Sequence, residues 1–237
     1  MSKRQEIRAR RRREEIRNRI LIISLVVVGV FLFVFVVFIN PLLHKPTTPS
    51  VVSITPRVLN TKVDGVHLGD PNAPVKVDVY ADFRCSGCLY YVNNIEPQVI
   101  QKYVETGKVY YGYHSYIVID GHDGTDASLR SANAAMCANE QGRFWDYHDT
   151  LFANQITEDA SLFTDARLVK MAENLKLDMT AFNQCYQAKK YASVVQQDIA
   201  QAQSFKITGT PSIIINGTLL SDFSQTTQGI DSALAGK

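Results

Sequence analysis

The chain has 237 residues, of which 46% are hydrophobic and 20% are charged, and its formal net charge is +2. This length and balance fit one well-packed globular domain and exclude a disordered or collagen-like chain. Residues 1–19 contain nine Lys/Arg and three Glu, so this stretch carries +6 and the rest of the chain carries −4. The basic character therefore belongs to an N-terminal tail.

Residues 20–39 are apolar apart from Ser24 and Gly29. A helix of this length spans roughly 30 Å, the thickness of a bilayer's hydrocarbon core, so the stretch predicts one transmembrane helix. A cleaved signal peptide is the alternative, but its apolar part is about 7 to 15 residues long and is followed by small residues. The sequence here continues with Asn-Pro-Leu-Leu-His-Lys over residues 40–45. Because positive charge stays on the cytoplasmic side, the tail predicts a cytoplasmic N-terminus and an extracytoplasmic C-terminal part. Topology explains the tail, and we expect no nucleic-acid binding.

Residues 40–57 contain four prolines mixed with Thr and Ser, which predicts a stiff, extended linker. Residues 58–237 then form the predicted domain. Its first strand is predicted at 75–80, a helix with a kink at Pro97 at 88–105, and a second strand at 108–119.

Helical patterns dominate the next eighty residues and predict an insertion over about 122–190. The predicted helices cover residues 126–138, 144–153, 165–175, 179–187 and 191–205. Asn216-Gly217 between the apolar runs 212–215 and 218–220 predicts a hairpin, and a last helix is predicted over about 225–235. The element order is βαβ, a helical block, then ββα.

Two of the four cysteines form a close pair, Cys85 and Cys88, at the junction of the first strand and the following helix. A redox-active dithiol, half of a zinc site and a static disulfide are the possible interpretations. Zinc needs about four ligands, and no second CxxC or nearby pair of histidines exists, so we expect no metal. A bridge across two residues would constrain the unfolded chain very little. The dithiol interpretation is therefore favoured.

The other two cysteines, Cys137 and Cys185, are far apart in the sequence. A bridge between them would close a loop of about 49 residues and contribute on the order of 4 kcal/mol in the chain-entropy model. We expect a structural disulfide here. A second redox-active pair is the alternative.

Four motifs in order complete the pattern: Gly69-Asp-Pro-Asn-Ala-Pro-Val75, Asp82-Phe-Arg-Cys-Ser-Gly-Cys88, Gly142-Arg-Phe-Trp-Asp-Tyr-His-Asp149 and Gly209-Thr-Pro211. With the element order, they make residues 65–235 resemble the DsbA-like thiol:disulfide oxidoreductases, in particular the membrane-anchored branch. The resemblance implies an α/β thioredoxin fold with a helical insertion after the second core strand. It also implies catalytic Cys85 and Cys88, and a cis bond before Pro211 that lets Thr210 pair with substrate.

The sequence departs from the family at two places. The family commonly has Pro within its CxxC, whereas Ser86 and Gly87 stand here, and it commonly has an acidic residue where this chain has Val79. Asp78 is adjacent but should face the other side of the strand. Ser86 and Gly87 offer no charge or ring to a Cys85 thiolate, so we expect them to tune the pair to be less oxidising than one that contains His.

The other candidate residues are expected to be structural. Trp145 and His148 fit packing or capping in the helical block, and His114 lies in a predicted strand.

The leading functional hypothesis, from the resemblance, is oxidation of cysteines in exported proteins. It implies no cofactor on the chain, a membrane partner of the DsbB or vitamin K epoxide reductase type that reoxidises the pair, and a single-pass protein of the cell membrane. We expect a monomer. A reductase or isomerase kept reduced by a membrane electron donor is one alternative, and a redox-silent peptide-binding module is another.

Overall fold

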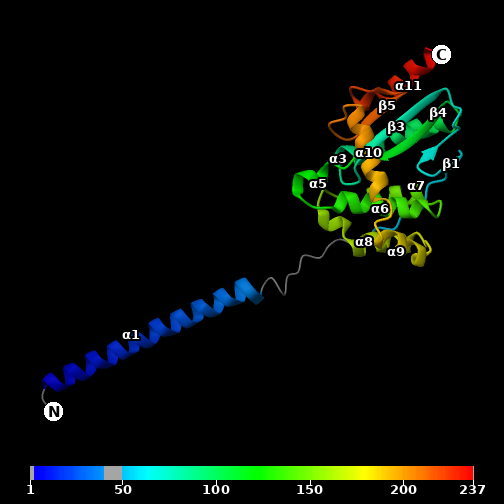
Figure 1. Cartoon of the computed structure of the whole chain (residues 1–237). Coiled ribbons are helices and arrows are strands. Elements are labelled where there is room, and N and C mark those ends of the chain that lie inside the picture. The colour runs from blue at the N-terminus through cyan, green and yellow to red at the C-terminus, as the bar shows by residue number, and fades with distance from the viewer. Residues whose placement is uncertain (1–2, 40–49, 237) are drawn as a thin grey trace. The chain divides into compact units, whose positions relative to one another are not determined.

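The computed structural model describes residues 3–39 and 50–236 and divides the chain into two units, Met1–Thr48 and Pro49–Lys237 (Figure 1). In the first unit, α1 (Lys3–Val34) continues into a π-helical turn (Phe35–Ile39). The segment Ile16–Val37 within it has a mean hydropathy of 3.4, so it is long and apolar enough to cross a membrane. Part of the predicted linker, residues 40–49, lies outside the described residues. Residues 50–57 contain no helix or strand but pack on the rest of the second unit: the Val52 N–H donates to Asn154, and Arg57 pairs with Glu96 and Asp149.

The second unit is built on one mixed sheet with the strand order β1-β2-β4-β3-β5-β6. The central strands β3 (Val75–Ala81) and β4 (Val109–Ser115) are parallel, and the other neighbours are antiparallel. The remaining strands are short: β1 (Val63–Asp64), β2 (His67–Leu68), β5 (Ser212–Ile215) and β6 (Thr218–Leu219). The predicted strands and hairpin are therefore present, with β1 and β2 as additions that were too short to recognise in the sequence.

Two helical layers enclose the sheet. On one face, buried Val77, Val79 and Tyr113 pack into the main core. That face is covered by α3 (Ser86–Asn94), α4 (Glu96–Val99), the π-helical segment Ile100–Val104 and α11 (Thr226–Ala235). On the other face, Tyr80 and Ile214 pack with residues of α10 (Ala192–Ser204), which crosses in front of the strands in Figure 1.

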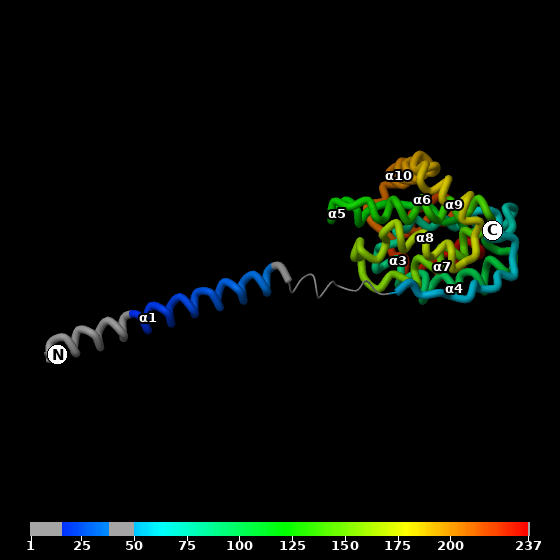
Figure 2. The backbone as a smooth tube through the Cα atoms, turned by 90° about the horizontal axis from the view of Figure 1, so that it is seen from below, coloured from blue at the N-terminus to red at the C-terminus, as the bar shows by residue number. Residues whose placement is uncertain are grey.

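A helical block follows β4, and its helices lie close together in Figure 2. It consists of α5 (Ile119–Asp123), α6 (Ala127–Asn139), α7 (Phe144–Ala153), the 3₁₀ turn Ala160–Phe163, α8 (Asp165–Asn174) and α9 (Met179–Gln187). The thioredoxin fold with a helical insertion, preceded by one apolar helix, is confirmed. Cys137 on α6 and Cys185 on α9 form a disulfide that joins two helices of the insertion.

The kink predicted at Pro97 is present: the helix predicted over 88–105 is interrupted at Ile95, because Pro97 in the first turn of α4 has no N–H to donate and clashes with the preceding turn. One other element differs from its prediction for an identifiable reason. The strand predicted over 108–119 ends at Ser115. Beyond it, the Asp82 carboxylate accepts the N–H groups of Val118 and Ile119, which turns the chain into α5.

Candidate active site

The CxxC pair lies where β3 leads into α3, on a turn fixed by Asp82. This carboxylate is fully buried and accepts the Arg84 N–H at 2.9 Å as well as the two N–H groups at the start of α5. Cys85 is then the N-cap residue of α3. Its sulfur therefore lies at the end of the helix where unpaired N–H groups favour an anion.

The surroundings of Cys85 favour its thiolate. A hydrogen bond from the Cys88 thiol is the largest contribution, and the backbone N–H groups of Gly87 and Cys88 add to it. Burial acts in the opposite direction, yet the pKa of Cys85 falls to about 6. The reactive form of a thiol is the thiolate, so Cys85 is suited to nucleophilic attack near neutral pH.

Cys88 lies one turn further into the helix and is almost completely buried, with 1% of its surface exposed against 8% for Cys85. Burial raises the pKa of Cys88 well above that of an ordinary thiol. Both sulfurs are free. The pair thus combines an acidic thiol that keeps a small exposed surface with a fully buried, protonated thiol.

The loop before β5 packs against the pair. The Thr210–Pro211 bond is cis, and the Cys85 thiol donates to the Thr210 carbonyl oxygen at 3.3 Å. A Cβ atom added to Gly87 would lie 3.3 Å from Pro211 Cδ, tighter than most Cβ contacts. Glycine therefore lets the helix start approach the proline closely.

Arg84, directly before the pair, is fully buried and connects it to the helical block. Its guanidinium donates hydrogen bonds to Asp120 and to Thr125, both at 2.8 Å. It also forms an ion pair with Asp123 and donates to the Glu158 carbonyl oxygen. Sequence reasoning missed this residue, although it lies inside the quoted CxxC motif.

The segment 155–158 also borders the pair. The Gln155 side chain donates to the Arg84 carbonyl oxygen, and Glu158 Oε1 accepts the N–H of Ser86 at 3.0 Å. Glu158 thus places a carboxylate at the first residue of α3. No motif connects these positions to the cysteines in the sequence, and only the fold shows the contact.

The positions flanking the site have the orientations expected from the strand pattern. Val79 points into the main core, whereas Asp78 on the opposite face bonds to His114 Nε2 at 3.2 Å. His114 Nδ1 contacts Asp198 at 3.1 Å. Burial lowers the pKa of His114, but the bonds to Asp198 and Asp78 outweigh it and raise the value to about 9. Val79 stands at the position where the family commonly has an acidic residue, and neither Asp78 nor Asp198 lies there.

Trp145 and His148 are packing residues, as expected. Both are buried on α7, and their rings contact each other with centroids 5.2 Å apart. They form part of the aromatic core between the sheet and the helical block.

Comparison with known proteins supplies the family. The family model described as "Thioredoxin" matches residues 61–234. The chain belongs to the thioredoxin family. The relatives place this thioredoxin-family chain among the DsbA-like thiol:disulfide oxidoreductases, as the resemblance of its motifs predicted. "Probable disulfide bond formation protein D" of Bacillus anthracis is 29% identical over 171 residues, which are 70% of this chain and 77% of that one.

Solved structures of this family have the same fold. BdbD from Bacillus subtilis, in its oxidised form, superposes with a TM-score of 0.64 at 23% identity and covers 79% of this chain and 100% of that chain. Wolbachia pipientis alpha-DsbA1 superposes with a TM-score of 0.62 at 24% identity, over 72% of this chain and 91% of that chain.

Proposed function

We propose that this chain is a membrane-anchored oxidase that donates the Cys85–Cys88 disulfide to cysteine pairs of exported proteins. The observation that supports it most directly is the asymmetry of the pair: an acidic sulfur at a helix N-terminus lies beside a buried, protonated one. Such a pair is poised for thiol–disulfide exchange.

The reaction proceeds in two exchanges. A substrate thiolate attacks the Cys85 sulfur, the Cys85–Cys88 bond breaks, and the Cys88 sulfur leaves and takes up a proton. The substrate's second thiolate then attacks the mixed disulfide, so that the substrate is oxidised and Cys85 leaves as its thiolate. The low pKa of Cys85 makes it a good leaving group in this second step.

Thr210 and Pro211 are the proposed substrate-binding residues. The Thr210 carbonyl oxygen lies 3.3 Å from the Cys85 sulfur, so a backbone paired with this residue would be brought to the reacting atom. An extended segment bound in this way needs no particular side chains, which suits an enzyme that acts on many substrates.

The apolar helix supplies the proposed location. Residues 1–19 carry +6 in front of it, which favours a cytoplasmic N-terminus and an extracytoplasmic catalytic domain of a single-pass protein of the cell membrane. There, a membrane partner of the DsbB or vitamin K epoxide reductase type would accept the two electrons and restore the disulfide. We propose a monomer with the boundaries 1–19, 20–39, 40–57 and 58–237, and the insertion at about 122–190.

Trapping of mixed disulfides tests the activity. In a Cys88→Ser variant the Cys85 thiolate can still attack a disulfide of a substrate, which breaks that disulfide and displaces one of its sulfurs as a thiolate. Cys88 cannot then release the mixed disulfide, so complexes sensitive to reductant should accumulate in cells. The matched Cys85→Ser variant retains a buried thiol and should trap none. Equal amounts of complexes in both variants would contradict the proposed roles, and their absence in both would indicate a binding module.

A further inference from the structure

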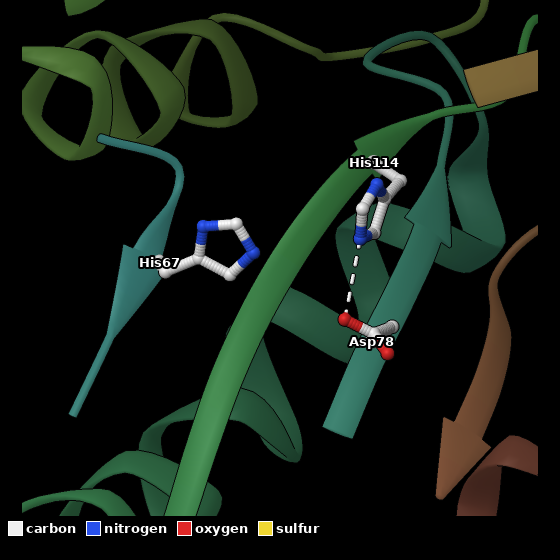
Figure 3. A group of neighbouring side chains, drawn as sticks. All are labelled: His67, Asp78 and His114. Carbon is white, nitrogen blue, oxygen red and sulfur yellow. Dashed lines mark hydrogen bonds and ion pairs between the residues drawn. The ribbon is translucent and has the colours of Figure 1, made fainter. Parts of the chain in front are cut away.

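A second group of chemically capable side chains lies on the face of the sheet that α10 covers, away from the main core. His67 on β2, Asp78 on β3 and His114 on β4 each offer a ligand atom, and these atoms all lie within 4.8 Å of one another. Figure 3 shows the three side chains projecting from three adjacent strands, with the contact between His114 and Asp78 dashed. The proposed oxidase chemistry uses none of them.

Strand register creates this group. His67 on β2 and Asp78 on β3 both pair with Gly112 of β4, one from each side, and His114 is two residues further along β4. Residues that are side by side, or two apart on one strand, point to the same face of a sheet. The three side chains therefore converge above Gly112.

Gly112 leaves the space that these side chains occupy. A Cβ atom at this position would lie 2.8 Å from His67 Cδ2, 2.9 Å from Asp78 Oδ1 and 3.0 Å from His67 Nε2. Real Cβ atoms essentially never approach other atoms this closely, so any larger residue would push the imidazole or the carboxylate away. Glycine here keeps a nitrogen and an oxygen ligand together over the strand.

Each imidazole is oriented by outer contacts. His114 Nδ1 contacts Asp198, whose second oxygen accepts the Ser115 N–H at 3.0 Å, so Nε2 is directed at Asp78. The His114 ring also stacks on Tyr80, with centroids 4.8 Å apart. A carboxylate behind a histidine is the usual outer shell of a protein metal ligand.

His67 has its own supports. Its ring stacks on Tyr110 with centroids 4.9 Å apart and an interplanar angle of 2°. Each of the two histidines is therefore held against an aromatic ring, and His114 is held by a carboxylate as well.

We propose that His67, Asp78 and His114 bind one zinc ion, with Asp198 as the positioning residue of His114. Two imidazoles and one carboxylate are ligands that zinc accepts in three-ligand sites, where a water completes the tetrahedron. The 3.2 Å between His114 Nε2 and Asp78 Oδ1 is close to the separation of two ligands around one zinc ion at about 2.0–2.1 Å. The Asp78 side chain is 36% exposed, which leaves a path for the ion and the water.

A second group, Glu96, His148 and Asp149, has a similar composition, but an arginine neutralises its carboxylates and, unlike an imidazole, cannot give up a proton to bind a metal ion. Arg57 Nη1 lies 2.8 Å from Glu96 and Arg57 Nε lies 2.9 Å from Asp149, so a cation occupies the position between the carboxylates. A metal ion would have to displace this guanidinium. The group above Gly112 is therefore the better candidate among the described residues.

Zinc titration of the full chain in detergent micelles tests the proposal. The Cys85–Cys88 pair is kept oxidised so that its thiolates do not bind metal, and the purification tag contains no histidine. Calorimetry should show one zinc ion per chain, and Co²⁺ should give the visible absorption of a tetrahedral site. His67→Ala should weaken zinc binding by more than about 100-fold and Asp198→Asn by about 10-fold or more.

Two further variants separate metal binding from folding. Gly112→Ala retains every ligand but should weaken zinc binding as strongly as His67→Ala, because its Cβ displaces the His67 ring. His122→Ala, an exposed histidine on α5, is the matched control and should bind zinc like the parent chain. Urea unfolding of every variant in the presence of EDTA tests whether the metal-free fold is intact.

Three results would overturn the proposal: no stoichiometric zinc binding by the parent chain, unchanged binding by a folded His67→Ala variant, or loss of binding on His148→Ala with His67→Ala unaffected. The last result would place the ion at Glu96 and His148. A trapping assay of the zinc-free protein is independent of all three, so failure of the metal site leaves the proposed oxidase function testable by itself.

Discussion

The two sulfurs of the CxxC pair differ because their surroundings differ by one helical turn. Cys85 receives N–H donors at the start of α3, whereas Cys88, one turn further in, has only 1% of its surface exposed. With a pKa of about 6, Cys85 is mostly ionised at pH 7. Relative to an ordinary thiol this stabilises the reduced pair by about 1.4 kcal/mol, which makes its disulfide more oxidising by about 30 mV.

The first prediction concerns the ionisation of Cys85. The rate at which iodoacetamide alkylates the reduced protein should rise with pH and have its midpoint near pH 6, because only the thiolate reacts. The folded pKa lies below that of an unfolded thiol, about 8.5. The stabilisation that the Cys85 thiolate gives to the reduced fold is therefore complete above about pH 8.5, and it is lost as the pH falls through 6. A midpoint near 8.5 would contradict the assigned surroundings.

A second prediction concerns Glu158, whose carboxylate accepts the Ser86 N–H at the helix start. A negative charge there opposes the Cys85 thiolate, so Glu158→Gln should lower the pKa of Cys85 further, by about half a unit for a solvent-exposed pair. The same alkylation profile measures the shift. Glu173→Gln on α8, where Glu173 pairs with Lys170, is the matched control and should change nothing. A rise in the pKa of Cys85 would show that the hydrogen bond, rather than the charge, dominates.

At the scale of elements, Arg84 fixes the helical insertion to the CxxC turn. It binds Asp120, which also accepts the N–H groups of Ser128 and Leu129 at the start of α6. One side chain therefore joins the β3–α3 turn, α5 and α6. The insertion and the reactive turn are held together by charge and hydrogen bonds in addition to apolar packing.

Arg84→Ala should lower the free energy of unfolding by about 3 kcal/mol, because it leaves Asp120 and Asp123 without their buried partner. Urea unfolding of the oxidised protein measures the loss. Arg130→Ala is the matched control: Arg130 on α6 pairs with two exposed carboxylates, Asp126 at 3.4 Å and Asp165 at 3.7 Å, and its loss should cost under about 1 kcal/mol. Equal losses in both variants would mean that Arg84 contributes only as an ordinary surface pair.

Elements with a strong periodic pattern could be predicted from the sequence, and α7 and α9 have the predicted bounds. The position of the cysteines at a strand–helix junction could also be predicted from the sequence. The contacts of Arg84 and Glu158 could not, because they join segments that are 36 to 74 residues apart in the sequence. Likewise, β2 has two residues and its register with Gly112 cannot be deduced from spacing, so the group around His67 emerged only from the fold.

At the scale of the whole molecule, the chain combines an apolar helix with a catalytic unit that carries its own sheet and core. In the proposed arrangement, a membrane tether would keep the enzyme at high local concentration near its redox partner and so favour repeated reoxidation of the pair. The direction of electron flow then depends on the potential of the pair. Its acidic Cys85 favours an oxidant, while Ser86 and Gly87 add no charge or ring that would stabilise the thiolate further.

The reduction potential of the Cys85–Cys88 pair, measured by equilibration with glutathione, therefore tests the central claim most directly. We predict a value more oxidising than thioredoxin's, about −270 mV, and less oxidising than DsbA's, about −120 mV. A value near −120 mV would contradict the tuning role assigned to Ser86 and Gly87. A value at or below about −270 mV would contradict the proposed oxidase and indicate a reductase.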